Sequence, residues 1–384
     1  MAKILMKGNE AIGEAAIRAG ATNYFCYPIT PQTEVAEYLA RRMPEVGGVF
    51  LQAESEVAVG NMLFGAAATG RRVFTTSSSP GISLMQEAIS YIAGAQLPCV
   101  LLNIMRGGPG LGGILPAQSD YFQATKGGGH GDYRLMVLAP SSIQEAVDLT
   151  MDAFPLAEKY RNPVMIIGDG MIGQMMEPVE FPDEVDKGDP ATNEGWAATG
   201  ARDRKPRVIK SLYLDPYKLE ENSYVLHEKY EQMKQHEVRY ERYKISAKND
   251  LLIVSYGTMA RICQTAIDEL EQEGVSVGLF RPITLFPYPE KELRKEIEAR
   301  NVKNVLVVEM SCGQMLEDVE RVVQGVKPVT FFGRTGGIVP SPEEAKEQIK
   351  NMIKKPTRAK KASKATAKKQ AAKKKSSKRQ RKDA

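Results

Sequence analysis

The sequence lacks the patterns that would define a membrane protein or a metal protein. It contains no run of about eighteen apolar residues, so we expect no membrane-spanning helix. Its four cysteines stand far apart, at positions 26, 99, 263 and 312, and none belongs to a Cys-x-x-Cys pair. This spacing excludes the usual zinc and iron–sulfur motifs and favours reduced thiols. The amino terminus has no uninterrupted apolar core of the kind found in signal peptides, so we expect a cytoplasmic protein.

The net charge of +5 conceals two regions of opposite sign. Residues 354–384 contain 15 of the 52 lysines and arginines and one of the 47 acidic residues, so the rest has 37 basic against 46 acidic side chains. The basic tail has no apolar periodicity, and we expect residues 353–384 to be a disordered, Lys/Ala-rich tail. Charge alone would let the tail bind nucleic acid or an acidic partner, and a solvated appendage is the alternative. We do not expect a nucleic-acid partner.

Apolar runs alternate with amphipathic segments along the first 175 residues. Short apolar runs indicate buried strands at residues 24–27, 49–52, 72–76, 98–105, 135–138 and 163–167. Helical patterns lie between them, such as the one that begins near Asn9, a fair N-cap residue. This alternation predicts an α/β fold in which a parallel sheet has helices on both faces.

The pattern changes at about residue 176 and again at about residue 250. Residues 176–249 begin rich in proline and acid and continue into a very polar helical segment, which indicates an irregular, helical connector. Four more strand-like runs, with helical patterns between them, follow in residues 250–352. These runs predict a second, smaller α/β domain.

The stretch FCYPITPQTEVAEYL, residues 25–39, predicts a strand that stops abruptly before a helix. Pro28 ends the strand because it cannot donate to a ladder, and Pro31 suits the first position of a helix. Thr30 would then be the N-cap, with its hydroxyl beside unpaired amide donors. Such a corner can bind an anion, and an ordinary capped turn is the alternative.

Three further motifs stand where α/β sheets place ligands. Glu54 and Glu56 enter an otherwise apolar helix, either as an ordinary first turn or as buried carboxylates that need a partner. In TTSSSPGISL, Gly81 permits close backbone approach, although a capped surface turn would look the same. Arg106 ends an apolar strand before RGGPGLGG, which suits carboxylate recognition or a surface arginine. The later glycine-rich loop with His130 could cover such a site.

GDG at residues 168–170 resembles the metal and diphosphate motif of thiamine diphosphate enzymes, in which two asparagines follow. Here only the solitary Asn193 stands at the right distance, so we interpret the GDG as a turn and expect no metal site in this chain. A nicotinamide or flavin dehydrogenase is a weaker interpretation, because Pro109 interrupts GPGLGG and no helical pattern follows it.

Three longer segments resemble the alpha subunit of 2-oxoacid:ferredoxin oxidoreductases. They are GNEAIGEAAIRAGATNYFCYPITPQTEVAEYL, SSSPGISLMQEAISYIAGAQLPCVLLNIMRGGPG and VVEMSCGQMLEDVERVV. The resemblance extends to about residue 352. RGGPGLGGILPAQSDYFQATKGGGHGDYR is most similar to the branched-chain (2-oxoisovalerate) type, with the 2-oxoglutarate type as its near neighbour.

The resemblance implies a pyrimidine-binding domain at residues 1–175, the connector at 176–249 and a transketolase-C-like domain at 250–352. It implies thiamine diphosphate shared with a partner subunit, with Mg²⁺ and iron–sulfur clusters on partners. The expected partners are a diphosphate-binding beta subunit, a gamma subunit, a ferredoxin-like iron–sulfur subunit and ferredoxin. The expected reaction is oxidative decarboxylation of the 2-oxoacid with CoA to acyl-CoA and CO₂. A non-catalytic scaffolding subunit is the alternative.

The resemblance also assigns roles to residues. Glu56 matches the family's glutamate that hydrogen-bonds the aminopyrimidine ring and starts the cofactor's proton transfer, and Glu54 is a weaker candidate. Thr30 matches a threonine that contacts substrate, and Arg106 matches the arginine that holds the substrate carboxylate. The presence of Glu56, Thr30 and Arg106 together favours a catalytic subunit over a scaffold.

Overall fold

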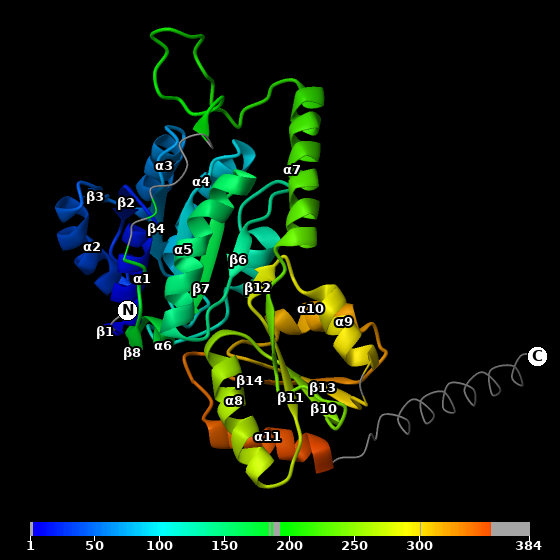
Figure 1. Ribbon diagram of the computed structural model, residues 1–384. Coiled ribbons are helices and arrows are strands. Elements are labelled where there is room, and N and C mark those ends of the chain that lie inside the picture. Colours follow the sequence, from blue (N-terminus) through cyan, green and yellow to red (C-terminus); the bar gives the residue numbers. More distant parts are fainter. Residues whose placement is uncertain (1–2, 184–185, 187–192, 300, 355–384) are drawn as a thin grey trace, which may run out of the picture.

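The computed structural model describes residues 3–183, 186, 193–299 and 301–354. Within these ranges the chain forms two α/β units joined by a connector that contains a long helix (Figure 1). The predicted basic tail, from residue 355 onward, lies outside the described residues. Among the described residues, no helix is long and apolar enough to cross a membrane.

The first unit is built on a seven-stranded sheet in the order β12-β6-β7-β5-β4-β2-β3. Its pairs are parallel, except that β12 runs antiparallel to β6 at the edge. The strands are β2 (Asn23–Cys26), β3 (Val49–Gln52), β4 (Val73–Ser77), β5 (Val100–Met105), β6 (Met136–Leu138), β7 (Val164–Asp169) and β12 (Thr284–Phe286). Because β3 and β4 lie on opposite sides of β2, the winding direction reverses there, and open α/β sheets bind ligands at such carboxyl edges.

Helices cover both faces of this sheet, as the alternation predicted (Figure 1). On one face, α1, α2 and α5 pack around buried side chains such as Leu39 and Phe154. On the other face, α3 and α4 pack around Leu63 and Ile89. The helices are α1 (Gly8–Arg18), α2 (Thr33–Glu45), α3 (Glu56–Ala67), α4 (Ser79–Gly94), α5 (Ile143–Tyr160) and α6 (Gly170–Gln174).

The second unit is a five-stranded sheet in the order β14-β13-β10-β11-β9, with β9 antiparallel at one edge. Its strands are β9 (Tyr240–Tyr243), β10 (Leu251–Val254), β11 (Gly278–Pro282), β13 (Asn304–Glu309) and β14 (Val329–Gly333). Its helices are α8 (Gly257–Gln272), α9 (Glu290–Ala299), α10 (Gln314–Val323) and α11 (Pro342–Lys354). The apolar core around α3 and α4 continues into this unit through Leu252 and Val307, so the two units share buried surface.

Segments from outside the first 175 residues complete the first unit. β8 (Met176–Val179) pairs antiparallel with β1 (Ile4–Lys7) beside the main sheet. α7 (Pro216–His236) runs along α4. Within the first 175 residues, a single π-helical turn, η1 (Gln123–Gly127), follows the loop after β5.

The predicted N-cap role of Thr30 is wrong. α2 begins at Thr33, and Gln32 occupies the N-cap position. The carbonyl of Pro31 accepts hydrogen bonds from Asn9 Nδ2 at 2.8 Å and from Gln174 Nε2 at 3.0 Å. These two amides hold the residues before α2 as a separate turn, so the helix starts later.

The N-cap predicted at Asn9 is also wrong, because its side chain hydrogen-bonds residues distant in sequence. Lys7 stands at the N-cap position of α1, and Asn9 is a fully buried residue inside the helix. Its side-chain amide donates to Pro31 and to Glu34 of α2 rather than to its own helix. The asparagine therefore fixes the turn after β2.

Candidate active site

The candidate residues gather at the carboxyl edge of the seven-stranded sheet. The turn after β2 carries Thr30, and the helix after β3 begins at Glu56. β4 ends at Ser77, Gly81 lies in the first turn of α4, and Arg106 follows β5. Parallel strands bring these four connections to one edge, at the reversal of strand order.

Glu56 is the first residue of α3, and its side chain is 6% exposed. Ser55 caps this helix by accepting a hydrogen bond from the amide of Ala58 at 3.3 Å. The structure records no hydrogen-bond partner for the Glu56 carboxylate among the described residues. Glu54, two residues earlier, is exposed. Burial therefore separates the two candidates: Glu56 is almost enclosed by protein, whereas Glu54 lies in solvent.

Gly81, in the first turn of α4, gives Glu56 its space. A Cβ at position 81 would lie 2.6 Å from Glu56 Oε1 and 2.1 Å from Ser77 Oγ. Both distances are far below van der Waals contact, so the absence of a side chain lets the carboxylate and the hydroxyl lie against the α4 backbone. The sequence predicted close approach at Gly81 but did not identify what approaches it.

Buried polar atoms without partners lie in and directly after β4, next to the turn with Gly81, and further along α4. The hydroxyls of Thr75, Ser77 and Ser78, at the end of β4, have no hydrogen-bond partner among the described residues, and neither has Gln86 Nε2 on α4. Unpaired buried polar groups are costly and uncommon in folded proteins, so a cluster of them indicates a site built for a polar ligand.

Arg106 and Thr30 lie together, as the resemblance implied. Arg106 is 8% exposed, and its Nη1 donates to the carbonyl of Thr30 at 2.9 Å. Its Nη2 donates to the carbonyl of Leu111 at 3.2 Å, while Nε is buried without a partner. The guanidinium thus joins the turn after β2 to the glycine-rich loop after β5 and keeps one buried donor free. Thr30 itself is exposed.

Ser79 and Asp120 connect the two halves of the site. Ser79 Oγ accepts from the amide of Arg106 at 3.1 Å and donates to Asp120 Oδ2 at 2.6 Å. Asn103 Nδ2 also donates to Asp120, at 2.8 Å. Burial raises the pKa of Asp120, against the effect of these hydrogen bonds and of the Arg106 charge. Sequence reasoning missed Asp120, because nothing in QSDYF distinguishes it from a surface acid.

The second unit holds the loop after β5 in place. Gln118 pairs with Met310 through two hydrogen bonds of 2.9 Å, and its Nε2 donates to the carbonyl of Tyr256 at 2.9 Å. Tyr121 donates to the buried Asp318 at 2.6 Å. A site on the first unit is therefore fixed in part by the end of β13 and by α10.

The GDG segment, predicted as a turn, joins a strand directly to a helix: Gly168 and Asp169 end β7, and Gly170 begins α6. Asp169 caps the short helix α6 by accepting from the amides of Met171 at 2.8 Å and Ile172 at 3.4 Å, and burial raises its pKa. Asn193 donates instead to the carbonyl of Gly70 at 2.7 Å. Among the described residues, no group of three His, Cys, Asp or Glu side chains could hold a metal ion.

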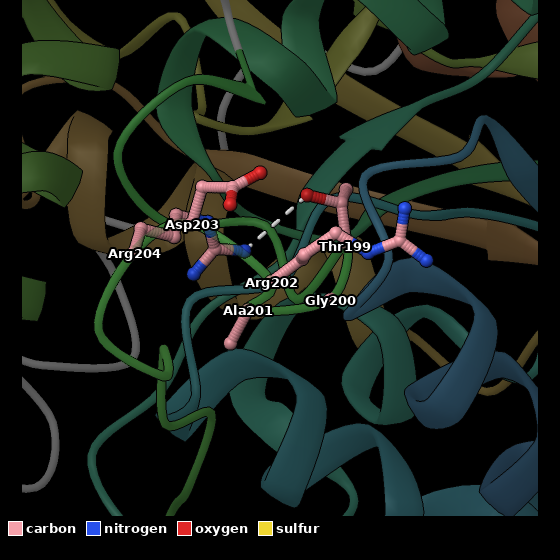
Figure 2. Close-up of a pocket in the computed structure, with 6 residues that line it drawn as sticks. All are labelled: Thr199, Gly200, Ala201, Arg202, Asp203 and Arg204. Carbon is pink, nitrogen blue, oxygen red and sulfur yellow. Dashed lines mark hydrogen bonds between the residues drawn. The ribbon is translucent and has the colours of Figure 1, made fainter.

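Two other features lie away from this edge. The loop with His130 packs along α4, where Ser90 donates to the His130 carbonyl at 2.7 Å, well beyond the first turn that carries Gly81. Figure 2 shows a hollow lined by six consecutive residues, 199–204, in which Arg204 donates to Thr199 at 3.3 Å. This hollow is the interior of one curled loop and contains none of the candidate residues.

A parallel sheet that places a buried carboxylate, unpaired hydroxyls and a buried arginine at its reversal point is the architecture of a cofactor-dependent α/β enzyme. The chain belongs to the pyruvate flavodoxin/ferredoxin oxidoreductase family. That family's thiamine diphosphate-binding domain matches residues 14–244, and core domain II of pyruvate:ferredoxin oxidoreductase matches residues 249–345.

Characterised relatives of similar length support this placement. The chain is 47% identical to the ketoisovalerate oxidoreductase subunit VorB of Methanothermobacter thermautotrophicus, covering 92% of this chain and 98% of the relative. It is 36% identical to the 2-oxoglutarate synthase subunit KorA of the same organism, with the same two coverages. The resemblance to the branched-chain type, with the 2-oxoglutarate type next to it, is confirmed.

Solved structures show the same fold. The 2-oxoglutarate:ferredoxin oxidoreductase from Magnetococcus marinus, with 2-oxoglutarate, coenzyme A and succinyl-CoA bound, matches with a TM-score of 0.82 at 28% identity. The match covers 92% of this chain but only 65% of that longer chain. A split-gene transketolase matches with a TM-score of 0.56 at 14% identity, which concerns the fold alone.

Proposed function

We propose that this chain is a catalytic subunit of a thiamine diphosphate-dependent 2-oxoacid:ferredoxin oxidoreductase and supplies the pyrimidine-binding half of the active site. The observation that carries the proposal is the buried, unpaired carboxylate of Glu56, set against Gly81 in a domain of the thiamine diphosphate-binding family. A non-catalytic scaffold would have no reason to keep a glutamate in this enclosed position against the α4 backbone.

The residues at this edge fit an aminopyrimidine ring. The ring offers nitrogen donors and acceptors, and the unpaired Ser77 hydroxyl, which lies with Glu56 against Gly81, offers a complementary group. When bound, thiamine diphosphate supplies the nucleophilic carbon and the electron sink that decarboxylation of a 2-oxoacid requires. Glu56 hydrogen-bonds a ring nitrogen and moves a proton there, as a general acid or base does.

Arg106 and Thr30 bind the carboxylate of the 2-oxoacid in this proposal. The guanidinium is held by two carbonyls, so its orientation is set before substrate arrives, and the free Nε is the donor available to a carboxylate. Thr30 is exposed at the same turn, where its hydroxyl can reach the bound acid.

The proposed substrate is a branched-chain 2-oxoacid, 2-oxoisovalerate, converted with CoA to acyl-CoA and CO₂ while ferredoxin takes the electrons. Identity to the ketoisovalerate subunits, 47 and 48%, exceeds the 34 to 36% found for four 2-oxoglutarate synthase subunits. The second candidate is 2-oxoglutarate, favoured by the structural match to an enzyme with that substrate bound.

Partner subunits complete the site in this proposal. Large apolar side chains are exposed around it, namely Tyr27, Leu51, Val57 and Leu84. A rim of this kind fits the docking of a beta subunit that brings the diphosphate and Mg²⁺ site. In this chain the aspartate of the GDG already caps α6 through its Oδ1. A gamma subunit and a ferredoxin-like subunit with the iron–sulfur clusters would complete the complex, with residues 1–175, 176–249 and 250–352 as the divisions of this chain.

The test is a substrate panel on the complex purified with its native partners. Reduction of a viologen dye should require CoA and thiamine diphosphate, with kcat/KM highest for 2-oxoisovalerate. A preference for 2-oxoglutarate would establish the second candidate instead. A complex that turns over no 2-oxoacid would contradict the proposed function.

A further inference from the structure

The connector between the two units exposes many large apolar side chains close together. Between β8 and the middle of α7, six large apolar side chains are 50 to 89% exposed. We call them the connector patch: Val208, Leu212, Leu214, Tyr217, Tyr224 and Val225. Single exposed apolar residues are ordinary, but a group this dense in eighteen residues indicates a contact surface.

The backbone beneath half of this patch is unpaired. Residues 208–214 alternate strictly between exposed and half-buried, as one face of an extended strand does. Ile209 faces inward and packs on the core around α4, while the outward side chains are exposed to solvent. The amides and carbonyls of residues 208–214 make no backbone hydrogen bonds among the described residues. An extended, apolar, unpaired segment is a template for strand addition by another chain.

The rest of the patch lies on the first turns of α7. Leu226, Tyr230 and Met233 are buried on one face of α7, whereas Tyr217 and Tyr224, seven residues apart, share the opposite face. Figure 1 shows the loop before α7, and the amino end of α7 itself, extending beyond the ends of α3 and α4. The patch is therefore accessible and continuous from loop to helix.

Basic side chains next to the patch indicate an occupant that carries acidic side chains. Residues 202–210, next to the patch, hold five basic side chains and one acid. A different subunit with acidic side chains beside an apolar surface would complement these basic groups. Relatives such as the Aeropyrum pernix and Saccharolobus solfataricus alpha subunits extend well beyond this chain, which covers 53 and 62% of them, so their family carries a further portion in one polypeptide.

We propose that the connector patch is the docking surface for a different subunit of the complex, one that adds an extended segment against residues 208–214 and presents acidic side chains to residues 202–210. This inference rests on the proposed assembly of the chain into a multi-subunit oxidoreductase. The partner should have an apolar contact surface that is bordered by acidic side chains.

The experiment reassembles the complex from separately expressed subunits and measures each pairwise affinity by sedimentation. Leu214→Ser with Tyr217→Ser should weaken binding of one other subunit at least about tenfold, because buried apolar and tyrosine contacts dominate interface affinity. Arg202→Glu with Lys205→Glu should slow association and reduce its salt dependence. The control pair is Leu5→Ser with Val326→Ser, which removes exposed apolar side chains elsewhere and should leave every affinity unchanged.

Hydrogen exchange gives a second measurement that does not depend on variants. The amides of residues 208–214 should exchange rapidly in the isolated chain and slowly in the complex. Unchanged exchange, unchanged affinities, or loss of self-association alone would each overturn the inference. If the wild-type subunits do not assemble at all, the proposed function fails rather than the choice of surface.

Discussion

At the scale of single residues, the strongest prediction concerns the two carboxylates at the start of α3. Glu56→Gln should lower kcat of the assembled complex about 10²- to 10⁴-fold, the range for a general acid–base group, because an amide cannot move the proton. Glutamine has nearly the same shape, so assembly and thermal unfolding should stay as in the wild type. Steady-state dye reduction with saturating 2-oxoisovalerate measures the effect.

Glu54→Gln is the matched control for this prediction. Glu54 is exposed, two residues away on the same segment, and loses the same charge on substitution. Its variant should keep near wild-type turnover. If Glu54→Gln were the damaging change and Glu56→Gln the mild one, the assignment of the proton-transferring residue would be reversed.

Arg106 should act on the carboxylate that all 2-oxoacids share. Arg106→Lys keeps the charge but loses the planar fork that now holds Thr30 and Leu111. Losing a charge-assisted contact costs roughly 1.5 to 3 kcal/mol, so KM should rise about 10- to 150-fold for pyruvate, 2-oxoisovalerate and 2-oxoglutarate alike. A change in the ranking of the three acids would show that Arg106 contacts the far end of the substrate.

At the scale of elements, the packing of α3 on α4 sets the position of Glu56. A Cβ at Gly60 would lie 2.6 Å from Cβ of Ala88, and neither atom can rotate away. Gly60→Ala should therefore lower the free energy of unfolding by about 1 to 3 kcal/mol, as overpacking does. Gly65→Ala, in the same helix with nothing within 4 Å, should instead raise it by about 0.5 to 1 kcal/mol. Chemical denaturation of the isolated chain measures both, and equal effects would contradict the packing argument.

α7 is anchored by a lysine whose charge is costly. Lys229 is 9% exposed and donates to the carbonyl of Arg161 at 3.1 Å, and burial, helped by the Arg161 charge, lowers its pKa to about 7. The unfolded chain keeps that proton up to about pH 10, so it binds more protons than the native state above pH 7, and stability should rise with pH there. Lys229→Met should remove this rise, up to about 1 kcal/mol per pH unit between pH 7 and 9, in denaturation curves compared with the wild type.

The elements show what a sequence can and cannot reveal. Alternating apolar runs correctly predicted the parallel sheet with helices on both faces, because burial imposes that pattern residue by residue. The positions of Thr30 and Asn9 were mispredicted, since local capping preferences lost to the long-range hydrogen bonds of Pro31 with Asn9 and Gln174. The unpaired hydroxyls at the end of β4 and the buried Asp120 depend on contacts distant in sequence, which no local pattern contains.

At the scale of the whole molecule, we expect partner subunits to complete the candidate site. The buried carboxylate, the free hydroxyls and Arg106 all lie at one edge, beneath a rim of exposed apolar side chains. The chain spans its ketoisovalerate relative almost completely but only 65% of the Magnetococcus chain. We therefore expect the diphosphate and Mg²⁺ site and the iron–sulfur clusters to lie on separate polypeptides.

This division predicts the behaviour of the isolated chain. Alone, it should bind thiamine diphosphate weakly and without dependence on Mg²⁺, because it provides contacts to the pyrimidine ring but leaves the diphosphate, the strongest anchor, in solvent. Calorimetric titration of the isolated chain and of the complex measures this, and affinity should rise and become Mg²⁺-dependent only in the complex. The pyrimidine contacts can be isolated by titrating thiamine, which lacks the diphosphate: Glu56→Gln should weaken its binding to the chain, whereas Glu54→Gln should not. Tight, Mg²⁺-dependent binding of thiamine diphosphate by the chain alone would place the whole cofactor site on this polypeptide and contradict the division.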